Sequence, residues 1–160
     1  MKKTTLYILP LALAFAALVS ACTSLDCSID NLVMMNVGIP DTLKADTLTV
    51  AALTESGDTD IYTNGTGVTS FTIPLSHGQD ADRFLFTFTD TTGSVLSDTV
   101  TISKINQAHM ESVDCPPQFW HTIQGVTTTH NRLDSISVIN TLVDNDLSEE
   151  NITLHLHPRR

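Results

Sequence analysis

Hydrophobic and polar residues alternate along most of the chain beyond residue 30, with the two-residue period of a half-buried β-strand. The clearest run is Phe84, Phe86 and Phe88, which we expect to lie in the core. The apolar positions of the other runs are Val33, Met35, Val37 and Ile39; Leu48, Val50 and Ala52; Phe71, Ile73 and Leu75; Leu96, Val100 and Ile102; Ile136 and Val138; and Ile152, Leu154 and Leu156. Residues 118–128 are also expected to be extended.

Turn-forming segments separate these runs. Asn64-Gly65-Thr66-Gly67 predicts a turn before the run that contains Phe71, and Asp90-Thr91-Thr92-Gly93 predicts the turn of a β-hairpin. About seven or eight short strands joined in this way predict an all-β fold. We expect a single antiparallel β-sandwich of the immunoglobulin-like kind.

The first residues have the composition of an export signal. Lys2 and Lys3 precede an apolar stretch that is too short to span a bilayer comfortably as a permanent helix. The stretch leads into Val19-Ser20-Ala21-Cys22, the pattern of a bacterial lipobox, in which small side chains precede the cysteine whose thiol takes the lipid. The alternative is an ordinary signal peptide with a cysteine nearby.

Cleavage before Cys22 would divide the chain into three parts. We predict a lipoprotein signal peptide at 1–21, a lipidated tether at 22–29 and a β-sandwich domain at 30–160. One acyl chain anchors a protein only marginally, whereas two or more hold it firmly, so the membrane is the first expected partner. No acidic run follows Cys22, and we expect an outer-membrane anchor that faces the periplasm.

The charge of the mature chain excludes one class of partner. Removal of Lys2 and Lys3 leaves six basic residues against 18 acidic ones, a net charge of −12. Nucleic-acid binding needs clustered Lys and Arg, so we expect none. The same charge argues against a polybasic membrane contact and favours a soluble, well-solvated surface.

Two cysteines remain once Cys22 carries lipid, namely Cys27 and Cys115. Outside the cytoplasm such a pair is usually oxidised, and a bond would close most of the domain into one loop. We predict a disulfide between them, with free buried thiols or metal ligation as the alternatives. The chain has no C-x-x-C spacing that would favour a redox or zinc-ribbon role.

The segment from Ser112 to Ile136 is the most distinctive, with its run SVDC followed by FWHTIQGVTTTHNRLDSI. Together with the early Leu25-Asp26-Cys27, it resembles a family of small Bacteroidetes lipoproteins of unknown function. Members carry a similar S-V-D-C … H-T-I-x-G-V-T-T-T-H-N motif after a cysteine-containing start. The resemblance implies an envelope location and a β-rich fold, and it supplies no activity.

An enzymatic or metal-dependent role would rest on His109, His121 and His130, which have acidic residues near them in the sequence. Because no G-x-S-x-G elbow and no H-E-x-x-H motif occurs, we expect neither a catalytic site nor a bound cofactor. His155 and His157 share a strand face that we expect to be solvated. Asp144-Asn145-Asp146 begins like a calcium loop, but Glu149 stands where the loop needs glycine.

Two features of the sequence concern carbohydrate. Exposed aromatic residues would be needed to bind a glycan, and the mature chain offers only Trp120 and Tyr62 outside the phenylalanines. Bacteria of the group that the resemblance indicates also glycosylate exported proteins at Asp-Ser/Thr followed by an apolar residue or Thr. The matching positions are Thr42, Thr47, Thr91, Thr99 and Ser135.

The sequence therefore predicts a lipid-anchored, non-enzymatic protein of the cell envelope that acts as an interaction or structural module. Its partner would be an envelope protein or a glycan. The competing hypotheses are a metal-dependent or hydrolytic protein built on the histidines and a glycan-binding surface lipoprotein.

Overall fold

A computed structural model of the chain describes residues 32–39, 43, 46–110, 112–144 and 146–158. The predicted signal peptide and tether lie outside these residues. The described part contains ten strands and no helix. The strands are β1 (Met34–Gly38), β2 (Thr47–Thr54), β3 (Gly57–Thr66), β4 (Ser70–Pro74), β5 (Ala81–Thr89), β6 (Val95–His109), β7 (Gln118–Thr128), β8 (Leu133–Val138), β9 (Leu142–Val143) and β10 (Ile152–Leu156).

The strands form two sheets that pack face to face. One sheet has four strands in the order β4-β1-β10-β8, and the other has six in the order β3-β2-β5-β6-β7-β9. Neighbouring strands are antiparallel except β1 and β10, which pair in parallel with Val37 opposite Ile152. The all-β sandwich predicted from the sequence is confirmed, with one parallel pair that the alternation did not indicate.

Inward-facing residues of both sheets make one core, as the period-two pattern predicts. Phe84, Phe86 and Phe88 of β5 are at most 2% exposed, and Met35 and Val37 of β1 are fully buried. The core ties the two layers together because it draws on strands of both sheets. The predicted extended segment at residues 118–128 coincides with β7.

The predicted turn at residues 64–67 is wrong in its extent. Residues 57–66 form β3, an edge strand whose one partner among the described strands is β2. Of the predicted turn only Gly67 lies outside β3, with φ 63°. Along β3 the exposed residues include Asp58 and Asp60, so no buried stripe marks the strand in the sequence. Charged residues on an edge strand also discourage pairing with another chain.

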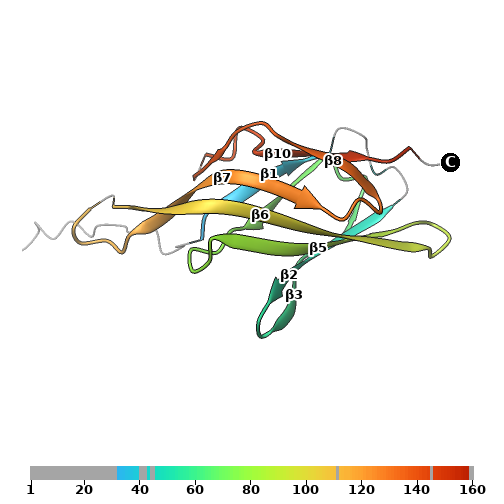
Figure 1. The fold of residues 1–160 in the computed structure, drawn as a ribbon, viewed down its shortest axis with the longest axis horizontal. Helices are drawn as coiled ribbons and strands as arrows, with labels where there is room; N and C mark the ends of the chain where they lie inside the picture. Colours follow the sequence, from blue (N-terminus) through green and yellow to red (C-terminus); the bar gives the residue numbers. More distant parts are fainter. Residues whose placement is uncertain (1–31, 40–42, 44–45, 111, 145, 159–160) are drawn as a thin grey trace, which may run out of the picture.

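Several hairpins project from the body of the sandwich (Figure 1). The β2–β3 hairpin forms an arm on one side, and the β6–β7 hairpin extends past one end of the molecule. The predicted turn at Asp90 is confirmed between β5 and β6, where the Gly93 N–H donates to the Asp90 carbonyl at 3.0 Å. No helix in the described part of the chain is long and apolar enough to cross a bilayer.

Candidate functional site

The inward face of β6 carries two charged residues among apolar ones. Asp98 and Lys104 are 0% and 3% exposed, and fully buried Val100 and Ile102 lie between them in the same alternating phase. Buried charges are costly unless they are paired or hydrogen-bonded. Each of these two charges therefore needs hydrogen-bond or ion-pair partners from other parts of the fold.

Asp98 organises the loop that joins β7 to β8. Its carboxylate accepts three consecutive backbone N–H groups, from Asn131 at 2.6 Å, Arg132 at 2.7 Å and Leu133 at 2.8 Å. The hydroxyl of Thr129 donates a fourth hydrogen bond at 2.8 Å. Burial acts to raise the pKa of Asp98, but these four hydrogen bonds outweigh it, and the pKa lies below its ordinary value.

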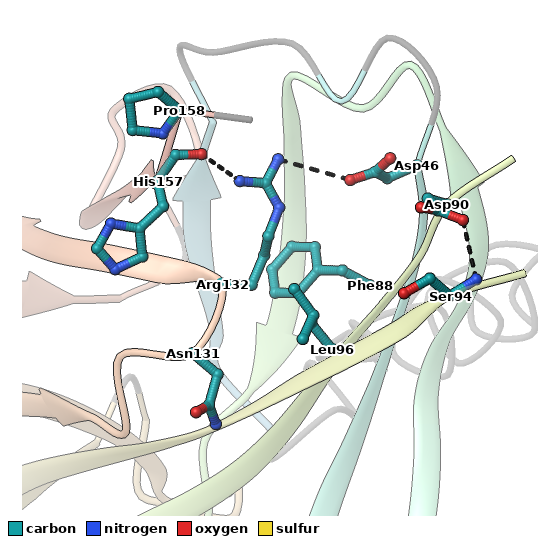
Figure 2. A pocket seen from close by; sticks show the side chains of 9 residues that line it. All are labelled: Asp46, Phe88, Asp90, Ser94, Leu96, Asn131, Arg132, His157 and Pro158. Carbon is teal, nitrogen blue, oxygen red and sulfur yellow. Dashed lines mark hydrogen bonds and ion pairs between the residues drawn. The ribbon is translucent and has the colours of Figure 1, made fainter. Parts of the chain in front are cut away.

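The loop held by Asp98 places the side chain of Arg132 across this end of the sandwich (Figure 2). One guanidinium nitrogen donates to the carbonyl of His157, just after β10, and another lies 3.6 Å from a carboxylate oxygen of Asp46. The side chain is 11% exposed, and its Nε has no hydrogen-bond acceptor among the described residues. Arg132 thus links the approach to β2 with the end of β10.

A half-open cavity of about 390 Å³ lies beside this ion pair. Its lining is Asp46, Phe88, Asp90, Ser94, Leu96, Asn131, Arg132, His157 and Pro158 (Figure 2). Asp90 is fixed here because its carboxylate accepts the N–H of Ser94 at 2.9 Å and that of Thr92 at 2.8 Å. The cavity offers donors and acceptors over an apolar base, which suits a small polar group.

A second polar cluster surrounds Lys104. Its ammonium group lies 3.2 Å from the Asp82 carboxylate and donates to the Gln79 carbonyl at 2.6 Å. The Asp82 carboxylate in turn accepts the N–H of Ser76 at 3.0 Å. The pair therefore closes the loop between β4 and β5 over the core, as Asp98 does for the loop between β7 and β8.

His121 lies near this cluster and is 1% exposed. Its Nδ1 is 2.8 Å from the side-chain oxygen of Asn106, and its Nε2 has no partner in the described part of the chain. Burial, followed by repulsion from Lys104 and His77, lowers the pKa of His121 to about 4. The imidazole is consequently neutral at pH 7.

A family of unknown function, DUF6452, matches the chain over residues 47–156. The chain belongs to this family. The matched range contains both polar clusters and most of the residues that line the cavity. No curated protein and no solved structure shows a significant match to the chain.

The three histidines proposed as an alternative site are engaged separately in this DUF6452 chain. His109 stacks on Trp120 with ring centroids 3.8 Å apart, and His130 has its Nδ1 2.7 Å from the carbonyl of Asp134. His121 lies near the start of β7, and His130 follows the end of that strand. Among the residues that the structure describes, no group of three or more His, Cys, Asp or Glu side chains is arranged to hold a metal ion.

His155 of β10 and His157, just after it, have partners across the sheet. The Nε2 of His155 lies 2.9 Å from the hydroxyl of Ser137, and the Nδ1 of His157 lies 3.4 Å from the Asp134 carboxylate. The Ser137–His155 pair has the separation of a nucleophile and base, but no described carboxylate hydrogen-bonds to His155. Neither residue lines the cavity beside Arg132.

The cysteines fall mostly outside the described residues. Cys22 and Cys27 both do, so the lipid attachment and the Cys27–Cys115 disulfide stay predictions. Cys115 lies in the loop between β6 and β7, where its N–H donates to the Ser112 carbonyl at 3.3 Å.

The structure gives physical roles to several of the proposed glycosylation motifs. Thr91 at the β5–β6 turn and Ser135 in β8 are exposed, Thr47 and Thr99 are half-buried, and Thr42 lies outside the described residues. The aspartates that precede Thr47 and Thr99 are Asp46 and Asp98, whose contacts are described above. Structure alone accounts for aspartate at these two positions, and modification at all five positions stays a prediction.

Sequence reasoning missed Asp98, Lys104 and Arg132. The sequence does indicate that Asp98 and Lys104 are buried, because they occupy core-facing positions of β6 at which the other residues are apolar. The role of Arg132 had no local signal, since its contacts come from Asp46 and His157, which are remote in the sequence.

Proposed function

We propose that the protein is a lipid-anchored, non-enzymatic interaction or structural module of the cell envelope, on the periplasmic side of the outer membrane. The lipobox-like segment that ends at Cys22 supports the anchor. A sandwich in which buried Asp98 and the Lys104–Asp82 pair each close a loop supports a role as a rigid scaffold.

The observation that carries the non-enzymatic part is the separate engagement of the histidines. A hydrolytic or metal site needs such groups to converge on one cavity. Here His109 stacks on an indole, His121 is buried against Asn106, and His130 contacts a backbone carbonyl. An interaction or structural module does not need its histidines to meet in one cavity.

Within this proposal, the cavity beside Arg132 is the point of contact with a polar group of the partner. The first described residue, Leu32, lies near His77 at one end of the sandwich. The cavity lies at the other end, where β5 ends and β6 begins. A lipid anchor near Leu32 would leave the cavity turned away from the membrane and open to other envelope components.

Membrane fractionation of wild type and Cys22→Ser tests the anchor. Wild type should need detergent for release, and the variant should be released by salt or remain unprocessed. A variant that matches wild type in both apparent mass and need for detergent would contradict the proposal. A photo-crosslinker at Leu96, on the cavity rim, should give a discrete adduct in cells, with Thr59 on the exposed β3 edge as the matched control.

The enzymatic alternative has its own readouts. Stoichiometric metal that is lost from His109→Ala, or labelling of Ser137 by a serine-directed phosphonate, would contradict the non-enzymatic proposal.

A further inference from the structure

The described chain enters the sandwich at the end from which the β6–β7 hairpin projects. The Leu75 N–H donates to the Val33 carbonyl at 3.2 Å. Two residues further on, the ring of His77 stacks on Phe119 at the base of the hairpin, with centroids 4.7 Å apart. Asn106, also at the base, donates to the Gln79 carbonyl at 2.9 Å. The first described residues and the hairpin therefore share one end of the molecule.

Large apolar side chains are exposed at this end. Met110 and Val113, beyond the base of the hairpin, are 62% and 89% exposed. On the outer face of the sheet, Ile105 pairs with Thr122, which pairs with Leu142, so the three lie in one row across β6, β7 and β9. Ile105 and Leu142 are 50% and 38% exposed, so this row is also apolar toward solvent.

Trp120, the one tryptophan of the chain, belongs to the same face. It pairs with Gln107, two residues along β6 from Ile105, and stacks on His109. Trp120 is half-buried: its ring packs against the core, and its Nε1 is buried with no hydrogen-bond partner among the described residues. The exposed surface is therefore aliphatic, and Trp120 beside it serves as a fluorescent reporter.

We propose that this membrane-facing surface, formed by Ile105, Met110, Val113 and Leu142, rests on the bilayer that holds the anchor. The inference rests on the proposed lipidation of Cys22. That residue precedes Leu32 by ten positions, which span at most about 35 Å when fully extended. The tether thus keeps this end close to the lipid.

The acidity of the chain specifies the kind of lipid. Asp114 is exposed beside Val113 at the hairpin tip, and the mature chain has excess negative charge. Contact should therefore be closest on zwitterionic bilayers and weaker on strongly anionic ones, where the surface potential repels acidic groups.

Trp120 makes the contact measurable with the full lipoprotein. The protein is reconstituted into phosphatidylcholine vesicles with and without lipids brominated near the headgroup end of the acyl chain. We expect bromine to quench Trp120 fluorescence, and to quench it less when half of the lipid is phosphatidylglycerol. Met110→Ser with Val113→Ser should reduce the quenching, and Val95→Ser, a 55% exposed residue at the other end of β6, should not.

A second variant is needed because Trp120 is half-buried and bromine could quench its fluorescence only weakly. In Trp120→Phe with Val113→Trp, the new indole at the hairpin tip should be quenched strongly. Flotation of the vesicles separates the two proposals: protein that does not float contradicts the anchor itself. Protein that floats while neither Trp120 nor the indole at position 113 is quenched would overturn the membrane-facing surface alone.

Discussion

The carboxylate of Asp98 accepts the backbone N–H of Leu133 at 2.8 Å, although the two residues are 35 positions apart. This hydrogen bond joins β6 to the start of β8, and so connects the two sheets. The neighbouring N–H of Arg132 donates to the same oxygen, which sets the guanidinium beside the cavity. A buried acid at this position is therefore the structural basis of the candidate site.

Replacement of Asp98 by Asn should lower the free energy of unfolding by about 3 kcal/mol, because an amide leaves part of the donor set without an acceptor. Urea denaturation at pH 7 measures the loss. Asp58→Asn on the exposed β3 edge is the matched control and should change stability by no more than about 0.5 kcal/mol. Equal effects of the two changes would show that the loop does not depend on Asp98.

The Arg132–Asp46 pair should behave as a coupled unit. Arg132→Met should cost about 3 kcal/mol, because it removes a buried cation from beside the Asp46 carboxylate and a donor from the His157 carbonyl. In the Asp46→Asn background the same change should cost about 1–2 kcal/mol less. A double-mutant cycle by urea denaturation checks this, and strictly additive losses would mean that the 3.6 Å contact contributes nothing.

His121 should make the protein less stable in mild acid. Its pKa is about 4 when folded, against about 6.5 when unfolded, so the unfolded chain binds more protons between these values. Stability is thus fully present above pH 6.5 and falls as the pH drops toward 4. The expected loss from this one group between pH 7 and pH 5 is about 2 kcal/mol.

The His121→Gln variant isolates that contribution. It should be less stable than wild type at pH 7 and lose less stability on going to pH 5. His130→Asn is the control, since Asn tolerates the positive φ of 61° at this position and His130 lies outside the core. If His121→Gln has the same pH dependence as wild type, the buried imidazole does not govern acid sensitivity.

Much of the fold could be predicted because burial follows alternation directly. In β1, β4 and β5 the alternating apolar residues of the sequence are the residues that are buried in the core. Strand β3 could not be predicted in this way, since an exposed edge strand has no buried stripe to record. In β2 the register shifts near Val50, and two successive residues, Val50 and Ala51, are buried there.

The candidate site was less accessible to sequence analysis for a different physical reason. Asp98 and Lys104 interrupt an apolar phase, so their burial could have been inferred from β6 alone. Their partners come from loops that only the tertiary fold brings close, such as the Gln79 carbonyl and the N–H of Leu133. A periodic sequence pattern shows which face of a strand is buried, but it does not show which loops pack against that face.

The predicted disulfide between Cys27 and Cys115 should be visible in thermal unfolding. Cys115→Ser should lower the melting temperature under non-reducing conditions and hardly at all with reductant. The chain-entropy model assigns a loop of this length about 4–5 kcal/mol. Equal melting of wild type and variant without reductant would contradict the bond, and Ser112→Ala in the same loop is the control for local packing.

The most direct test of the account is mass spectrometry of the N-terminal peptide from protein in the membrane fraction. A lipid-anchored module predicts that this peptide begins at Cys22 and carries the mass of a diacylglyceryl group with a further acyl chain. An unmodified cysteine, or a mature N-terminus at any other residue, would contradict the anchor and with it the proposed place of the protein in the envelope.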